Sequence, residues 1–263
     1  MKVLVINLAS AIDRFNFQKK QLTKLELEFE ILRAKNIDSI TPNIYKKYFY
    51  DWQRPMRKTE VACYFSHKAA WEFVIKKNEP LLIIEDDALL AKDIKEILLN
   101  LSKMKNIDLI NFENRGRKKF ISKNSLKISN KHSLYSLYQD RTGAACYLLW
   151  PSGAKKLISC EKKNGIALTD AHITSCYDIN SFQLEPAAAI QLDYCNHYKI
   201  KNPVNIDLSF STVSKQSNPK GGPKFWIKRI FHQLKLGFRQ ILLSRKSQRR
   251  YIKILSTDFE YRI

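Results

Sequence analysis

Three consecutive acidic residues, Glu85, Asp86 and Asp87, follow the apolar run at residues 80–84. An apolar run of this length predicts a buried strand, so the acids are expected at its C-terminal tip. Alternation along a strand would turn Glu85 and Asp87 to one side and Asp86 to the other. Carboxylates gathered at such a tip bind hard cations such as Mn²⁺ or Mg²⁺, which also hold substrate phosphates. An acidic turn leading into the next helix is the simpler alternative.

The elements that would position this cluster alternate between short apolar runs and amphipathic stretches. This alternation is typical of an α/β domain, with a mostly parallel sheet flanked by helices. Thr59 has the side chain of a good helix N-cap. The pattern predicts strands near residues 3–8, 29–34, 80–85, 107–112, 144–150 and 182–192, and helices from residues 13 and 59 and near 92–104, 151–158 and 170–177.

The remaining segments suggest how the chain is divided. Residues 113–140 are rich in Lys, Asn and Ser without a sustained period, so we expect a long loop or lid. Residues 211–223 contain Ser, Gly and Pro, which predicts a linker. We therefore expect an α/β domain over residues 1–210, the linker over 211–223, and a basic amphipathic helical appendage over 224–263.

The composition is that of a globular chain with a strong basic excess. Of 263 residues, 44% are hydrophobic, and the formal net charge is +21. Residues 215–263 hold 13 Lys or Arg against two acids, so about half of the excess lies in the last fifth of the chain. This imbalance calls for a polyanionic partner, which could be nucleic acid, an anionic membrane surface or a phosphorylated substrate.

Cysteine usage and hydropathy indicate the compartment. The five cysteines form no Cys-x-x-Cys pair, which favours a reducing environment. The N-terminal apolar run is short and contains Asn7, so we interpret it as a first buried strand rather than a signal peptide. No segment approaches the ~18 to 20 apolar residues that a membrane-spanning helix needs. We therefore expect a protein in a reducing compartment that is either soluble or peripherally attached to a membrane.

Several short motifs occur together in an order typical of one enzyme family. They are residues 5–8 with Asp13-Arg14, residues 60–67 (E-V-A-C-Y-F-S-H) with Trp71, residues 84–88 (I-E-D-D-A), residues 141–148 (R-T-G-A-A-C-Y-L), Gly153-Ala154 and Asp170. Over roughly residues 1–195 the chain resembles glycosyltransferase family 25, which includes bacterial lipooligosaccharide galactosyltransferases. The resemblance implies a GT-A-like fold, a UDP-sugar donor, a divalent metal ion and inversion at the anomeric carbon.

An inverting transfer needs a base that takes the proton of the acceptor hydroxyl. The resemblance places a lone acid at Asp170, which makes it the first candidate, with a plain helix N-cap as its alternative role. Glu113, just past the predicted strand at 107–112, is the second candidate base.

A metal ion that bridges the donor phosphates would stabilise the departing diphosphate. Glu85 and Asp87 are the expected ligands, and His197 is available as a further one. The expected donor-binding residues are Asn7, Arg14, Glu60, Ser66, His67, Asp86, Arg141, Thr142 and Gly143.

Simpler roles exist for several of these residues. Arg14 could be a solvated charge, residues 141–143 an ordinary turn, and His67 a hydrogen-bonded residue of a packed helix. Cys63 lies one helical turn before His67, but no third soft ligand is near in sequence, which disfavours zinc or a thiol nucleophile.

The tail interleaves apolar and basic residues at helical spacing. Trp226, Ile230, Leu234 and Phe238 can line one face of a helix, with basic side chains beside it. Such a helix is expected to lie on an anionic membrane surface. A helix packed on the domain with a solvated basic rim is the alternative.

Together these features predict a metal-dependent transferase that adds a hexose. The resemblance implies that the hexose is galactose in β linkage and that the acceptor is a lipid-linked lipooligosaccharide core. The expected place is the cytoplasmic face of the bacterial inner membrane. UDP-glucose and UDP-N-acetylhexosamine are alternative donors, because single substituents distinguish these sugars. A basic nucleic-acid-binding protein is a distant alternative. No recognition motif accompanies the charge, and the acidic triplet would repel phosphate, so no nucleic-acid partner is expected.

Overall fold

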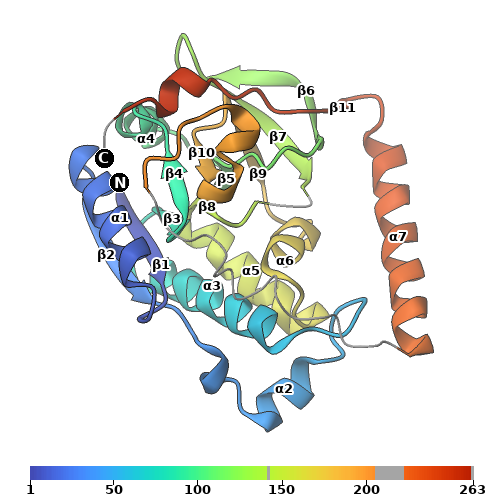
Figure 1. The fold of residues 1–263 in the computed structure, drawn as a ribbon. Coiled ribbons are helices and arrows are strands. Elements are labelled where there is room, and N and C mark those ends of the chain that lie inside the picture. Colours follow the sequence, from blue (N-terminus) through green and yellow to red (C-terminus); the bar gives the residue numbers. More distant parts are fainter. Residues whose placement is uncertain (141–142, 205–221, 262–263) are drawn as a thin grey trace.

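A nine-stranded mixed sheet forms the centre of the protein (Figure 1). The structure is a computed structural model that describes residues 1–140, 143–204 and 222–261. The sheet has the order β11-β6-β7-β9-β5-β8-β3-β1-β2. Its strands are β1 (Lys2–Asn7), β2 (Phe29–Arg33), β3 (Leu81–Glu85), β5 (Leu109–Asn111), β6 (Lys119–Lys127), β7 (Ser133–Gln139), β8 (Cys146–Leu149), β9 (Ser181–Glu185) and β11 (Ser247–Arg250). A second sheet pairs β4 (Ala88–Leu90) with β10 (Ala189–Gln191).

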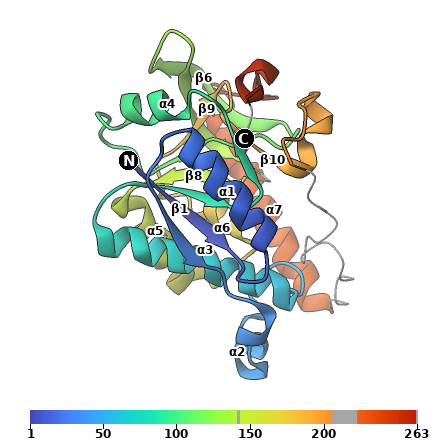
Figure 2. The same cartoon turned by 60° about the vertical axis from the view of Figure 1, so that its left-hand side comes forward.

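Helices cover both faces of the main sheet (Figures 1 and 2). Side chains of α1 and α4 pack in one hydrophobic core, and those of α3, α5 and α6 pack in another. Strand β3 serves both cores, since Leu82 and Ile84 join the first and Leu81 and Ile83 the second. The helices are α1 (Ile12–Lys24), α2 (Pro42–Tyr48), α3 (Lys58–Lys77), α4 (Ile94–Leu101), α5 (Pro151–Asn164), α6 (Thr169–Ser175) and α7 (Pro223–Leu243). The predicted α/β class, a Rossmann-like mixed sheet flanked by helices, is confirmed.

The register of the central strands brings the acidic triplet next to the end of β1. Strand β1 runs parallel to β3, with Ile6 opposite Glu85. Both strands therefore end at the same edge of the sheet, where α1 begins five residues after Asn7. On the other side of the triplet, β4 pairs with β10 so that Ala88 lies opposite Gln191. Three segments that are distant in sequence thus meet around the tip of β3: the end of β1 with the start of α1, the acidic triplet with β4, and β10.

Residues 113–140 are not a long loop, contrary to the prediction from sequence. Strands β6 and β7 form an antiparallel hairpin in which β7 also pairs with β9. The second half of β6 is exposed, with Lys, Asn and Ser among its residues. Because neither face of that half is buried, no apolar alternation marks it as a strand.

The start of α3 also differs from the prediction. Arg57 occupies the N-cap position, and Thr59 lies inside the first turn. The Glu60 carboxylate accepts the backbone N–H of Arg57 at 2.8 Å, so an acid three residues into the helix supports its start.

The predicted tail contains two different environments. Helix α7 lies along one side of the molecule (Figure 1), whereas β11 pairs antiparallel with β6 at the edge of the main sheet. Phe259 is buried in the first core. The predicted boundary at residue 224 therefore does not separate the tail from the sheet. Most of the predicted linker, residues 211–223, lies outside the described residues.

Close packing of α5 makes Gly153 sensitive to substitution. A Cβ atom at this position would lie 2.4 Å from the carbonyl oxygen of Asp108. We expect Gly153→Ala to lower the free energy of unfolding by about 1 to 3 kcal/mol, as measured by urea denaturation. Gly237→Ala in α7 is the control, because a Cβ there meets nothing within 4 Å and alanine favours a helix. Equal unfolding midpoints for the two variants would contradict the packing.

Candidate functional site

Asp86 is held at the tip of β3 by side chains from β1 and α1. Its carboxylate accepts hydrogen bonds from the Asn7 amide at 2.9 Å and the Arg14 guanidinium at 3.1 Å. Gln18 donates to the Asp86 backbone carbonyl at 3.2 Å. Burial raises the pKa of Asp86, although Arg14 and Asn7 favour the charged form. The structure thus brings together three of the predicted donor-binding residues, Asn7, Arg14 and Asp86.

Asp87 lies beside the same arginine with little other positive charge to offset it. Arg14 Nη1 is 3.9 Å from the Asp87 carboxylate, and Gln191 Nε2 is 3.4 Å from both of its oxygens. Burial, together with the negative charges of Glu85 and Asp86, raises the pKa of Asp87 to about 7. Carboxylates crowded in this way are stabilised by a bound cation.

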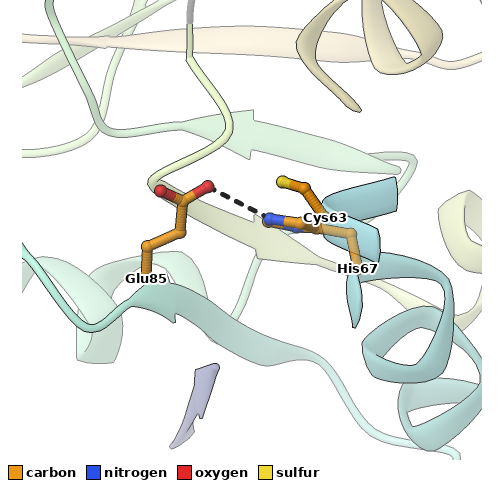
Figure 3. Close-up of side chains that lie close together, drawn as sticks. All are labelled: Cys63, His67 and Glu85. Atoms are coloured by element: carbon orange, nitrogen blue, oxygen red, sulfur yellow. Dashed lines mark hydrogen bonds and ion pairs between the residues drawn. The ribbon is translucent and has the colours of Figure 1, made fainter. Parts of the chain in front are cut away.

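Glu85 is paired with His67 of α3 (Figure 3). His67 Nε2 lies 3.1 Å from the Glu85 carboxylate, and Nδ1 lies 2.9 Å from the Tyr147 hydroxyl, which accepts a hydrogen bond from Trp71 Nε1. Burial favours a low pKa for His67, but Tyr147, Cys63 and Glu85 together raise its pKa well above the usual value. Burial likewise opposes ionisation of Glu85, yet His67 lowers its pKa. A buried hydrogen-bond chain therefore orients the first acid of the triplet.

The three acids do not follow the predicted alternation. Strand β3 ends at Glu85, and the next two residues form a turn. Asp86 and Asp87 consequently share the neighbour Arg14, whereas Glu85 is bound to His67. Strand geometry stops at the first acid, so alternation along a strand does not set the directions of Asp86 and Asp87, although the charge of Glu85 still acts on Asp87.

His197 does not join the acids in a compact group. It is exposed in a 3₁₀ turn (Asn196–Tyr198), where its ring packs on Tyr194 and Tyr198. In the described residues, Glu85, Asp87 and His197 do not together form a group of possible metal ligands within 4.8 Å of one another. The packing of His197 on two tyrosine rings explains its position.

Cys63, His67 and Glu85 do form such a group, with possible ligand atoms within 4.8 Å of one another (Figure 3). Both nitrogens of His67 already have partners, and Cys63 Sγ lies 3.5 Å from the Thr169 hydroxyl. A metal ion at His67 would have to displace Glu85 or Tyr147. The geometry therefore fits a hydrogen-bonded pair better than a zinc site.

Glu60 and Ser66, both predicted to bind the donor, have structural partners. Glu60 is buried and pairs with Arg54 at 2.6 Å and Arg57 at 2.8 Å. The Ser66 hydroxyl accepts the backbone N–H of Lys35 at 2.8 Å. These contacts fix the start of α3 and join this helix to the segment after β2.

A second polar cluster joins Glu113, which follows β5, with Lys119 at the start of β6 and Gln183 of β9. Glu113 is 1% exposed, and its carboxylate accepts the Ala145 N–H at 3.0 Å. Burial raises the pKa of Glu113 to about 8. Lys119, itself buried, donates to the Glu113 carbonyl oxygen and Gln183 and lies 2.5 Å from Asp140. The Glu113 carboxylate is thus closed to an acceptor hydroxyl in this structure.

Asp170 is more accessible than Glu113. Leu168 is the N-cap of α6, so Asp170 does not have the alternative role of helix cap, and its Oδ1 accepts the Ala171 N–H at 2.7 Å. Burial, followed by the charges of Asp140 and Glu85, raises the pKa of Asp170 to about 6. The residue lines a pocket whose wall also includes Asn111, Tyr138, Asp140, Gly143, Thr174 and Arg239.

Gly143 brings the backbone close to the polar side chains of this pocket. Its φ of +146° disfavours other residues, and a Cβ would lie 2.4 Å from the Asn111 amide nitrogen and 2.6 Å from the Asp140 carboxylate. Asn111 in turn donates to the Gly143 carbonyl at 2.9 Å. Arg141 and Thr142, the other predicted members of this motif, lie outside the described residues.

Several polar neighbours of the acids were missed from the sequence. Gln191 and Arg115 approach each other near Asp87, and Arg115 also pairs with Asp193 at 2.5 Å. Lys119 and Asp140 were assigned to a loop. In the sequence these four residues are marked only by their polarity, which solvent-exposed residues share. Their positions depend on the β4–β10 and β6–β7 pairings, which no local pattern in the sequence predicts.

Comparison with known proteins identifies the family. The model for glycosyltransferase family 25 (LPS biosynthesis protein) matches residues 1–173. Procollagen galactosyltransferase 2 of Homo sapiens is 26% identical over 250 residues, covering 81% of this chain and 38% of the relative. The chain therefore spans about two fifths of that relative's length. Lipooligosaccharide biosynthesis protein lic2B of Haemophilus influenzae is 21% identical over 251 residues, covering 88% of this chain and 94% of the relative.

Among solved structures, a Drosophila β-1,4-galactosyltransferase 7 mutant in complex with manganese, UDP-Gal and xylobiose aligns with a TM-score of 0.35 and 9% identity. The alignment covers 84% of this chain and 82% of that one, a likeness too low to argue from. The family match is different, because it covers about two thirds of the chain and includes both the motif at residues 60–67 and the acidic triplet. The chain belongs to glycosyltransferase family 25.

Proposed function

We propose that this chain transfers galactose from UDP-galactose, with inversion, to the core oligosaccharide of a lipooligosaccharide. The observation that carries the proposal is the acidic triplet at the end of β3, crowded enough to raise the pKa of Asp87 to about 7. Family membership supplies the glycosyl transfer. The printed names of two relatives, a procollagen galactosyltransferase and a lipooligosaccharide biosynthesis protein, support the sugar and the acceptor.

The chemistry of the triplet fits a hard divalent cation. Its side chains offer oxygen atoms only, and Arg14 offsets their negative charge incompletely. We propose that Asp86 and Asp87, with Glu85 beside them, hold Mn²⁺ or Mg²⁺. Such an ion, when bound, supplies positive charge that stabilises the diphosphate leaving group.

The protein side chains would position the donor and remove one proton. Arg14 provides a cationic group next to the proposed phosphate site, and Asn7 keeps the Asp86 carboxylate oriented. The acceptor oxygen forms a bond to the anomeric carbon as the bond to the UDP oxygen breaks. The acceptor proton passes to the Asp170 carboxylate, whose pKa of about 6 leaves it mostly ionised at neutral pH.

A lipid-linked acceptor would place the reaction at the cytoplasmic face of the inner membrane, with the protein bound peripherally. UDP-glucose and UDP-N-acetylglucosamine are the competing donors. Thermal-shift and hydrolysis assays with each of the three donors, in Mn²⁺ or EDTA, test the proposal. Manganese-dependent stabilisation by UDP-galactose above the others supports it. A preference for another donor, or no response to any, refutes the galactose assignment.

Asp87→Asn should abolish metal-dependent transfer, with a loss of at least roughly a hundredfold in kcat, since it removes one carboxylate charge without changing shape. Thermal denaturation should show an intact fold. Asp38→Asn, a control at an exposed acid, should leave turnover unchanged. Near-normal turnover of Asp87→Asn at low Mn²⁺ would remove this residue from the metal site.

The pH dependence of transfer tests the role of Asp170. Its pKa is raised to about 6, and the ionised form is the base, so kcat/KM should rise with pH through about 6 and then level off. Asp170→Asn should lower kcat by roughly 10² to 10⁴ and remove this acidic limb. An unchanged pH profile in the variant would assign the base to another residue.

A further inference from the structure

Helix α7 presents a continuous apolar surface to solvent. Eight large apolar side chains on this helix are between 37% and 72% exposed. We call them the α7 apolar face: Trp226, Ile227, Ile230, Phe231, Leu234, Phe238, Ile241 and Leu242. At 3.6 residues per turn they fall within an arc of about 160°. Contiguous exposed apolar surfaces of this kind mark sites that bind a protein or a membrane.

The opposite side of α7 is fastened to the domain by aromatic and polar contacts. Phe225 is buried and stacks on Tyr50 with ring centroids 5.5 Å apart. The Arg239 guanidinium lies 3.9 Å from the centre of the Tyr177 ring, and Gln240 donates to Gln139 at 2.6 Å. Surface helices usually turn their apolar side inward. Here the docking contacts hold it outward, so domain packing does not account for the apolar face.

The charges of α7 favour an anionic partner. The helix contains no Asp or Glu, and Lys224, Lys228, Arg229 and Lys235 are exposed, whereas Arg239 is docked on Tyr177. Arg245, Lys246 and Arg249 follow directly and are exposed. Although α7 has 21 residues, none of the described helices is apolar and long enough to cross a membrane. An apolar stripe bordered by basic residues instead suits a helix that lies in the plane of a bilayer surface.

We propose that the α7 apolar face inserts into the surface of an anionic phospholipid bilayer while the opposite face remains docked on the domain. Arg239 lies on the docked side and lines the pocket that contains Asp170. One helix would then contact both the membrane and the wall of the pocket that contains Asp170, the proposed base. The link to the acceptor rests on the proposed function, whereas bilayer binding does not.

Co-sedimentation with vesicles of phosphatidylcholine and phosphatidylglycerol, at a molar ratio of about 7 to 3, tests this proposal on the full chain. The double variant Leu234→Glu/Phe238→Glu should bind at least roughly tenfold more weakly than the wild type. Leu99→Glu/Leu126→Glu is the matched control, because both residues are exposed apolar side chains outside α7. It should bind like the wild type. Pure phosphatidylcholine should bind the wild type more weakly.

Tryptophan fluorescence gives a second measurement that does not depend on charge substitutions. Trp226 is 68% exposed, so its emission should shift to shorter wavelength when vesicles are added. Trp226→Phe should still bind vesicles but lose most of this shift. Equal vesicle binding by the two double variants, or an unchanged Trp226 environment, would overturn the proposal.

The same experiments separate a second copy of the chain from a membrane as the partner. In sedimentation equilibrium without lipid, the wild type and the α7 double variant should have the same mass, because the α7 apolar face is not expected to join two copies of the chain. A wild-type dimer lost in that variant, with vesicle binding retained, would assign the face to dimerisation and refute the bilayer proposal. Asp87→Asn should bind vesicles normally. The two proposals can therefore fail separately. Donor turnover reports on the proposed reaction, and vesicle binding reports on the α7 apolar face.

Discussion

The site depends on holding three neighbouring carboxylates at the end of one strand, although burial and mutual repulsion both oppose their ionisation. Parallel pairing of β1 with β3 stabilises this arrangement, because it places Asn7 and Arg14 where both donate hydrogen bonds to the Asp86 carboxylate. His67 neutralises Glu85 from the other side. Asp87 receives the least compensation, which is the electrostatic condition that a bound divalent cation would satisfy.

The core helices control the acids through hydrogen bonds as well as packing. Trp71 donates to Tyr147, which contacts His67, and His67 holds Glu85. The orientation of the Glu85 carboxylate therefore depends on a tryptophan inside the second core. In the second polar cluster, the buried Lys119 similarly holds Asp140, whose charge contributes to the raised pKa of Asp170.

The C-terminal region shows how one segment can serve two environments. Residues 247–250 complete the edge of the main sheet, and α7 packs on the domain through Phe225 and Arg239. The residues of the α7 apolar face are turned away from both contacts. Fastening the helix to the domain would let a membrane-bound element keep a constant position relative to the pocket, which a flexible tether would not.

The sequence by itself determined the α/β class, the central strands and the location of the acidic triplet, because these depend on local apolar runs and on a polar cluster directly after one of them. Tertiary structure decided which side chains face which. The polar β6–β7 hairpin is held in the sheet by pairing with β11 and β9. The β4–β10 pairing places Gln191 beside Asp87, and packing on two tyrosine rings holds His197 away from the acidic triplet. Those contacts join residues far apart in the chain, so no local period of hydrophobicity records them.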